Sequence, residues 1–421
     1  MDQPTNNSSK ITAVIVLVVT VIIIVVGGFV FKNSISSSNK NTNTSTAPQK
    51  IVYAVRKVTA ATENGATAYT TTVFKSAIDG SNKQQIYQTP MNATIQALAN
   101  GSFAVFDASL DVNNIKQISS SGTVEKTYSF PETVREFVMS PSGTIYAYGS
   151  FDIKTTTDGG PLSSIETLAV VMGDGTQKTF SAADFVPNAR KDFNQVVPLS
   201  FSNDNSTLYV EVWPTARGGD YSDPHGYYAI TIGTWNIDPL AFSGSKNLDF
   251  TLSESSPAIF NFDILPTSKQ AIISKARDIA IPMGFDLLNF QSHVSVPLFS
   301  IGTDGLYPNL SYLSNRISPN EQEIILTNSS NKTILIYNLQ SKKLGNEIKI
   351  DGDPQTWLSN NEIVYQVWHK KSWDDQQYSL KVFNLTTKQS TDVYTQTTDH
   401  VEGAGMSKIG DAYYQYVGPI E

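Results

Sequence analysis

The sequence predicts an all-β fold, a β-propeller of about seven four-stranded blades that follows a single N-terminal transmembrane helix. Three observations lead to this prediction. An apolar segment of 21 residues without a charge, Ile11–Phe31, lies near the N-terminus. Short runs of alternating apolar and polar residues follow, separated by Gly, Asn, Asp, Ser and Pro, as is typical of strands and turns. The runs group into units that repeat about every 40–60 residues, as propeller blades do.

The composition favours strands and narrows the range of functions. Charged residues make up 16% of the 421 residues, and Tyr (19) and Phe (20) are plentiful, a mixture that favours strands over helices. The chain has no cysteine, which excludes disulfides and thiolate chemistry. Only Asp2 and three lysines fall in residues 1–49, which leaves 27 basic and 37 acidic residues, a net charge of −10, for the rest. An acidic domain without a basic run is not expected to bind nucleic acid.

Residues 11–31 are expected to form the transmembrane helix, after a short tail at residues 1–10. The 21 residues, at about 1.5 Å each, span roughly 30 Å, the hydrocarbon thickness of a bilayer. Sixteen of them are Val, Ile, Leu or Phe, whose transfer into lipid is favourable. A cleaved signal peptide is the alternative, but its apolar region is usually shorter, about 7–15 residues, and Ser34-Ile35-Ser36 is a weak cleavage site. The lipid bilayer is therefore the first expected partner.

Two conflicting signals bear on the orientation in the membrane. One lysine precedes the apolar segment and three follow it closely, so the lysine count places the C-terminal side in the cytoplasm. Large domains, however, cross the membrane largely regardless of charge. Residues 32–49 also form a Ser-, Thr- and Asn-rich linker that cannot pack a core and resembles a surface stalk. We therefore expect a single-pass protein whose domain, residues 50–421, lies outside the cytoplasm.

The clearest repeat unit begins at Val134. The strand VREFVMS is followed by a turn at Pro141-Ser142-Gly143 and by the strand TIYAYGS. After a loop come a third strand, Thr167–Gly173, a turn at Asp174-Gly175 and a short fourth strand, QKTFS. Similar or weaker units begin near Ile51, Ile95, Val196, Ala258, Ser311 and Gln355. One such unit buries both of its faces only against neighbours, so a closed ring is the stable arrangement.

Three strand–turn–strand segments carry a resemblance to a known family. They are SPSGTIYAY (Ser140–Tyr148), FSNDNSTLYV (Phe201–Val210) and ISPNEQEIIL (Ile317–Leu326). They resemble the Ser-Pro-Asp-Gly turns of the TolB-type and dipeptidyl-peptidase-type (WD40-like) β-propellers, and FKSAIDGSNKQQI (Phe74–Ile86) is similar to the turn after the third strand in those families. The similarity covers most of residues 51–417, although only one turn keeps Ser-Pro-x-Gly. The resemblance implies a fold and no activity.

The two ends of the domain are predicted to share one blade. The first segment after the linker, IVYAVRK from Ile51, has no first strand before it, whereas the last segment, His400–Val417, has strand character. A C-terminal strand that completes the N-terminal blade would close the ring without an exposed sheet edge. This arrangement gives about seven blades, with six or eight as alternatives.

Motifs of catalysis, metal binding and cofactor binding are missing from the sequence. The four histidines are far apart and form no metal-binding spacing, and there is no G-x-S-x-G elbow, Walker loop, dinucleotide loop or calcium-loop pattern. The repeats run to the end of the sequence, so we expect no hydrolase domain of the kind that follows the propeller in the related peptidases. We therefore expect no catalytic residue, no metal and no cofactor.

Long segments between second and third strands are predicted to form the binding face. In an up-and-down blade these segments all emerge on one side of the ring, and long loops on a rigid scaffold commonly carry binding. Two of them combine aromatic and polar residues suited to recognition. The candidate ligand-binding residues are Trp213, Arg217, Tyr221 and His225 in one segment, and Trp368, His369, Trp373 and Asp374 in the other. The alternative is that the tryptophans only close the ends of their blades and the charged residues are solvated.

Together these features predict a membrane-anchored, extracytoplasmic propeller that acts as a binding or scaffolding module for a protein, peptide or glycan. One alternative is a hydrolase or lyase of envelope polymers with its site in the pore, because propeller sites assemble from separate blades. A second alternative is a sensor ectodomain. The ten-residue tail leaves no room for a cytoplasmic output domain, so such a sensor would work through a membrane partner.

Overall fold

The computed structural model divides the chain into two units, Met1–Thr46 and Ala47–Glu421. The structure describes residues 50–61, 67–107, 112–155, 161–187, 189, 193–213, 225–243, 258–278, 281–300, 310–311, 316–328, 333–370, 375–399 and 412–420. The tail, the transmembrane helix and the linker predicted at residues 1–49 lie outside this set. No helix within it is long and apolar enough to cross a membrane.

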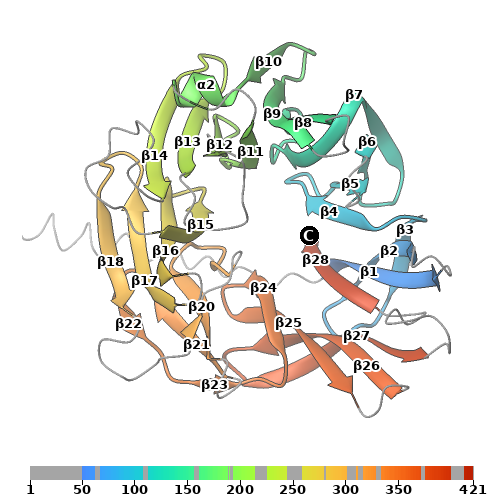
Figure 1. Ribbon diagram of the computed structural model, residues 1–421. Helices are drawn as coiled ribbons and strands as arrows, with labels where there is room; N and C mark the ends of the chain where they lie inside the picture. The colour runs from blue at the N-terminus through green and yellow to red at the C-terminus, as the bar shows by residue number, and fades with distance from the viewer. Residues whose placement is uncertain are drawn as a thin grey trace, which may run out of the picture. The chain divides into compact units, whose positions relative to one another are not determined.

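The second unit is a β-propeller of seven blades, as the repeats predict (Figure 1). Each blade is an antiparallel sheet whose first strand lies nearest the centre of the ring. Blade 1 contains β28 (Ala412–Ile420), β1 (Lys50–Ala61), β2 (Thr67–Ala77) and β3 (Gln84–Thr89). Blade 2 contains β4 (Ala93–Ala97), β5 (Phe103–Asp107), β6 (Val112–Ile118) and the first half of β7 (Val124–Met139). Blade 3 contains the second half of β7, β8 (Tyr146–Thr155), β9 (Pro161–Val171) and β10 (Gln177–Phe180).

The remaining four blades follow in chain order. Blade 4 contains β11 (Phe193–Phe201), β12 (Thr207–Trp213), β13 (His225–Thr231) and β14 (Ile237–Ser243), and blade 5 contains β15 (Ala258–Leu265), β16 (Gln270–Asp278), β17 (Ile281–Asn289) and β18 (Ser295–Ser300). Blade 6 contains β19 (Leu310–Ser311), β20 (Glu323–Asn328), β21 (Thr333–Asn338), β22 (Lys343–Leu344) and β23 (Ile348–Lys349). Blade 7 contains β24 (Asp353–Ser359), β25 (Glu362–Lys370), β26 (Asp375–Asn384) and β27 (Gln389–Asp399).

The ring closes through the C-terminal strand, as the sequence predicts. β28 pairs with β1 in antiparallel register, from Lys50 opposite Ile420 to Lys57 opposite Ala412. β1 therefore has a partner on each side, because it also pairs with β2 over its whole length. The two ends of the propeller chain are therefore joined by a strand pairing, and β28 supplies the innermost strand of the first blade.

Blades 2 to 4 are joined in one sheet, which the sequence does not predict. The repeats predict that a new unit begins at Val134. Instead β7 runs through this point, pairing with β6 in its first half and with β8 in its second. A short parallel contact between β11 and β9, at Phe193 and Asn194, joins blade 4 to the same sheet.

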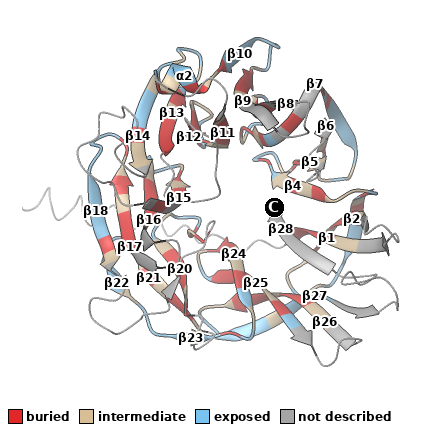
Figure 2. Cartoon of the chain, viewed as in Figure 1, coloured by how far each residue is buried: buried red, intermediate tan, exposed pale blue. Residues whose placement is uncertain are grey.

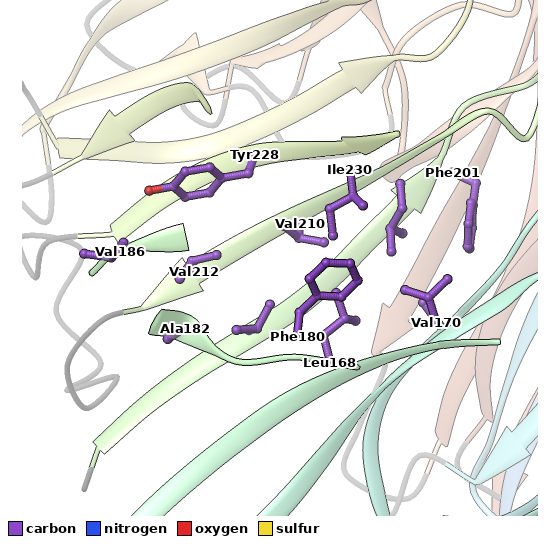
Figure 3. Close-up of a cluster of buried hydrophobic side chains, with 13 residues drawn as sticks. Leu168, Val170, Phe180, Ala182, Val186, Phe201, Val210, Val212, Tyr228 and Ile230 are labelled. Carbon is purple, nitrogen blue, oxygen red and sulfur yellow. The ribbon is translucent and has the colours of Figure 1, made fainter. Parts of the chain in front are cut away.

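The core lies between the faces of neighbouring blades. The cluster between blades 3 and 4 shows the arrangement (Figure 3): Leu168 and Val170 of β9 pack with Val210 and Val212 of β12. The short helix α2 (Ala182–Phe185), which follows β10, adds Ala182 to this cluster. Buried residues accordingly follow the strands around the ring, whereas β18, the outermost strand of blade 5, is largely exposed (Figure 2). Both faces of a blade are buried, so its strands are apolar on both sides.

The two rims of the ring differ. Tight turns join first to second strands on one rim, which we call the turn face. Each of five such turns holds one residue in the left-handed region, at Gly101, Gly143, Asn205, Lys269 and Glu321. On the opposite rim, the hairpin face, second and third strands meet. There β1 reaches Ala61, β8 reaches Thr155 and β25 reaches Lys370, so much of what the sequence suggests as loop is paired strand.

Candidate functional site

On blade 4 the structure brings together two of the predicted binding residues, and it buries both. Trp213 is the last residue of β12 and His225 the first of β13, and their exposed fractions are 3% and 1%. The two rings stack with their centroids 4.2 Å apart and their planes 19° apart. Glu211 Oε1 lies 3.7 Å from His225 Nε2, and the Tyr227 hydroxyl lies 3.3 Å from the same nitrogen. These side chains thus form a buried aromatic and polar cluster.

This cluster is continuous with the packing between blades 4 and 5. Tyr227 stacks on Phe262 of β15, with centroids 4.0 Å apart and planes 5° apart. Trp213 is also flanked on its inner side by the first strand of its blade, because it is paired with Gln195 of β11. Trp213 and His225 therefore pack within the blade rather than lie on its surface. Arg217 and Tyr221, the other two candidates of this segment, lie outside the described residues.

On blade 7 the structure places a predicted binding residue on the surface. Trp368 of β25 is 58% exposed, and it is the one aromatic residue among the large hydrophobic side chains that the described residues expose. It is paired directly with Tyr378 of β26, and the two rings are nearly parallel, with planes 14° apart and centroids 6.1 Å apart. His369 follows in the same strand, and only its backbone is described; Trp373 and Asp374 lie outside the described residues.

Trp368 is exposed because its hairpin extends beyond the first strand of the blade. The last pair between β24 and β25 joins Asp353 to Gln366, so Trp368 lies two residues past the edge of β24. Alternation along the strands places Trp368 and Tyr378 on the same side of the sheet as Val364 and Leu380. These two residues are buried against Tyr53 and Val55 of blade 1. The exposed pair therefore stands on a rigid apolar base.

On the turn face, hydrogen bonds between turns link successive blades. The Ala99 N–H of blade 2 donates to the Pro141 carbonyl of blade 3 over 2.8 Å. The Ser142 N–H of blade 3 donates to Asn205 Oδ1 of blade 4 over 3.0 Å. The next bond runs from the Asn203 amide of blade 4 to the Thr267 hydroxyl of blade 5, over 2.9 Å. These bonds, two of which involve side chains, thus join blade 2 to blade 3, blade 3 to blade 4 and blade 4 to blade 5.

Such hydrogen bonds continue through blades 5 to 7. The Thr267 and Ser268 N–H groups donate to the two carboxylate oxygens of Glu321 in blade 6, over 2.7 and 2.8 Å. The Asn320 N–H donates to Asn360 Oδ1 of blade 7 over 3.2 Å. Sequence reasoning missed these residues, although the recurring Asn, Asp and Ser of the turns are the groups that make such contacts.

Two cavities lie away from Trp368. One, of about 480 Å³, lies next to the first strands of blades 4 and 5 and includes Asp263, Glu321, Ser318 and Thr356. Its Glu321 carboxylate is held by the backbone of blade 5, which gives it a structural role. The other, of about 610 Å³, lies between blades 6 and 7 and is lined by Ile348, Phe383, Lys349 and Lys388 among others. In the described part of the chain, no group of three His, Asp or Glu side chains could hold a metal ion.

Comparison with known proteins gives similar folds and no family. No family model matches the chain, and no curated protein matches it. The β-propeller domain of Cps50 (Swd1) from Myceliophteria thermophila is 8% identical, with a TM-score of 0.43, over 80% of this chain and 96% of that chain. Prolyl oligopeptidase B from Galerina marginata is 11% identical, with a TM-score of 0.49, over 85% of this chain and 52% of the other. The dihydro-heme d1 dehydrogenase NirN is 12% identical, with a TM-score of 0.45, over 85% and 74%. The resemblance to TolB-type and dipeptidyl-peptidase-type propellers stays a prediction.

Proposed function

We propose that this protein is a membrane-anchored propeller that lies outside the cytoplasm and binds a ligand on its hairpin face. The exposure of Trp368 on a rigid strand is the observation that carries the binding role. An indole offers a large contact area at a small cost in conformational entropy, and tryptophan is enriched where binding energy concentrates. The stacked Tyr378 holds it in place and limits the rotamers that a ligand would have to fix.

The anchor in this proposal is the apolar segment at residues 11–31, and residues 32–49 are the spacer. Replacing Val21 and Ile22 by arginine places two charges near the middle of the segment, at about 2.5–3.5 kcal/mol each on insertion scales. We expect wild-type protein to stay in the membrane pellet after a carbonate wash and the double arginine variant to leave it. The matched control, Val21→Leu with Ile22→Leu, should stay in the pellet. Wild-type protein found in the soluble fraction would remove the anchor from the proposal.

Orientation is tested on intact cells with trypsin, which cleaves after lysine. The linker contains Lys40 among small polar residues, so cleavage there should release the propeller if it lies outside the cytoplasm. A Lys40→Gln variant should slow this release and so identify the site of cleavage. Protection of wild-type protein in intact cells, with cleavage after lysis, would place the domain in the cytoplasm, as the lysine count suggests.

Binding is tested by comparing what the full-length protein retains from solubilised envelope material with and without Trp368. The W368A variant should lose a component that the wild type retains. The control is Val294→Ala, because Val294 is similarly exposed, at 54%, and lies in the turn between β17 and β18 on the turn face. Identical profiles for wild type and W368A would contradict binding at this face.

The enzyme and sensor alternatives have less in their favour. A hydrolase in the pore needs acidic groups free to act on a substrate. Asp263 and Glu321 line the cavity next to the first strands, and both oxygens of Glu321 already accept backbone N–H groups. A sensor would need a membrane partner, which purification of the full-length protein in mild detergent would reveal. We therefore give the binding role precedence over both.

A further inference from the structure

The Trp368–Tyr378 pair has a geometry that narrows the class of ligand. The two residues lie directly opposite each other on β25 and β26, and their rings are nearly parallel. Tyr378 is partly buried against the cluster that joins blades 7 and 1, whereas most of the indole is open to solvent. The pair is therefore a fixed, flat aromatic surface; we call it the Trp368 platform.

A flat and open surface suits a sugar ring better than a peptide side chain. Strong peptide anchors usually fill desolvated pockets, and neither of the two cavities described above includes Trp368. The ring face of an indole carries partial negative charge. One face of a pyranose ring presents several C–H groups with partial positive charge, and these can lie flat on such a surface. Stacking of this kind needs no pocket.

Polar groups for the hydroxyls of a sugar lie beside the platform. No hydrogen bond of the Trp368 indole N–H is present among the described residues, and the side chain is 58% exposed, so this donor can bind a sugar oxygen. Gln366 lies one row below on the same side of β25; it already has an interaction within the protein, and an amide has several donor and acceptor sites, so it can also contact a sugar hydroxyl. This combination of stacking and neutral hydrogen bonding matches an uncharged carbohydrate.

Charge separates carbohydrates from the other polymers that stack on aromatic rings. Nucleic acid bases stack on tryptophan, but their affinity also depends on neutralising phosphates. The chain has 38 acidic against 30 basic residues, which opposes any strongly anionic polymer. A neutral polysaccharide carries no such penalty.

We infer that the Trp368 platform binds sugar rings of a neutral polysaccharide. The inference rests on the proposed function, because an anchored domain outside the cytoplasm lies within reach of such a polymer. The polymer would lie along the open hairpin face of blade 7, with one ring stacked on Trp368. Further sugars would contact neighbouring parts of the same face.

The test is electrophoresis of full-length protein, solubilised in a neutral detergent, through native gels that contain one neutral polymer each. Laminarin, hydroxyethyl cellulose, glycol chitin and mannan serve as probes. We expect at least one polymer to slow the wild type, and W368A to bind it about tenfold more weakly or worse. W368F, which keeps a ring, should retain part of the binding, and Val294→Ala should bind as the wild type does. Thermal unfolding of each variant shows whether the fold is kept.

Two results would overturn the inference: no polymer slows the wild type, or W368A is slowed as strongly as the wild type. A Trp368-dependent envelope protein with no polysaccharide binding would leave the proposed function standing and replace the sugar by a protein ligand. Polysaccharide binding by a chain that leaves the membrane in the carbonate wash would keep the inference and remove the anchor.

Discussion

Blades 4 and 7 both carry a tryptophan near the end of the second strand, stacked on a ring of the third strand, yet the two sites have opposite environments. Trp213 and His225 are buried, whereas Trp368 is 58% exposed on Tyr378. The first strand of each blade explains the difference. β11 still pairs with Trp213, but β24 ends its pairing at Gln366, two residues before Trp368. Burial at the hairpin face is thus decided by how far the inner strand reaches.

The largest expected effect is the loss of the buried tryptophan. Trp213→Ala should lower the free energy of unfolding by about 3–5 kcal/mol, because it leaves a cavity beside His225 and Tyr227. Denaturant unfolding of wild type and variant measures the difference. Trp213→Phe is the control and should lose less, since it keeps a ring against His225. A loss below about 1 kcal/mol for Trp213→Ala would mean that the site is not packed as a core.

A smaller effect is expected next to His225, at Gly226. A Cβ there would lie 2.8 Å from the Tyr228 ring, closer than real Cβ atoms come to a neighbour, and 3.0 Å from the Phe242 ring, a tight contact. Gly226→Ala should therefore destabilise the protein by about 1–3 kcal/mol through overpacking.

The matching position in blade 7 is Ser379, which follows Tyr378 as Gly226 follows His225. It is buried but has room for a side chain, and its hydroxyl lies 3.0 Å from that of Thr395. Ser379→Ala should lose about 1 kcal/mol at most, the contribution of one hydrogen bond. Thermal unfolding of the two variants side by side tests the difference between the blades, and a neutral Gly226→Ala would contradict it.

The sequence predicts the ring better than the sites on it. Turn residues mark the blades: Gly143 takes the left-handed conformation that its turn requires, and the Ser-Pro-x-Gly pattern shows it. The equivalent positions in the next three blades hold Asn205, Lys269 and Glu321, which adopt the same conformation without glycine. The left-handed conformation costs a residue other than glycine only about 1–2 kcal/mol, which tertiary packing can offset. Glycine is therefore not required at this turn position, and the motif is degenerate.

Predicting which aromatic residue is exposed requires knowing how far the neighbouring strand extends, and the local sequence does not encode this. An aromatic residue near the end of a strand has the same local sequence pattern whether or not the neighbouring strand extends to it. Trp213 and Trp368 therefore cannot be distinguished by sequence pattern alone. Strand lengths within one blade depend on pairing with residues about 15–20 positions away. The hydrogen bonds between turns, such as that from Ser142 to Asn205, join residues still further apart and follow from closure of the ring.

Asp204, in the turn before β12, leads to a prediction for how the stability of the fold depends on pH. The Asp204 carboxylate accepts hydrogen bonds from the Ser202 and Ser206 hydroxyls and from the Ser206 N–H, and these lower its pKa from 3.8 to about 2. Because the folded-state pKa is depressed, the carboxylate stabilises the fold above about pH 4, and this contribution is lost as the pH falls towards 2. Asp204→Asn should lower stability by about 1 kcal/mol or less at pH 7, since the group is exposed, and should remove that part of the pH dependence. Unfolding measured from pH 2 to 7 tests this, and parallel curves for both proteins would contradict it.

The smallest effect on stability is expected at the exposed tryptophan, and it separates the two blades most clearly. Trp368 is already mostly in water, so Trp368→Ala loses mainly its cross-strand contact with Tyr378, about 0.5 kcal/mol. Denaturant unfolding should therefore hardly change, while binding at the hairpin face is lost. If Trp368→Ala lowered the free energy of unfolding by more than about 2 kcal/mol, Trp368 would have the same packing role as Trp213. Loss of binding in W368A could then result from disruption of blade 7. The Val294→Ala control could not correct for that damage, because it lies on the other rim. A residue that matters for binding and not for folding is what distinguishes a recognition surface from the closed end of a blade.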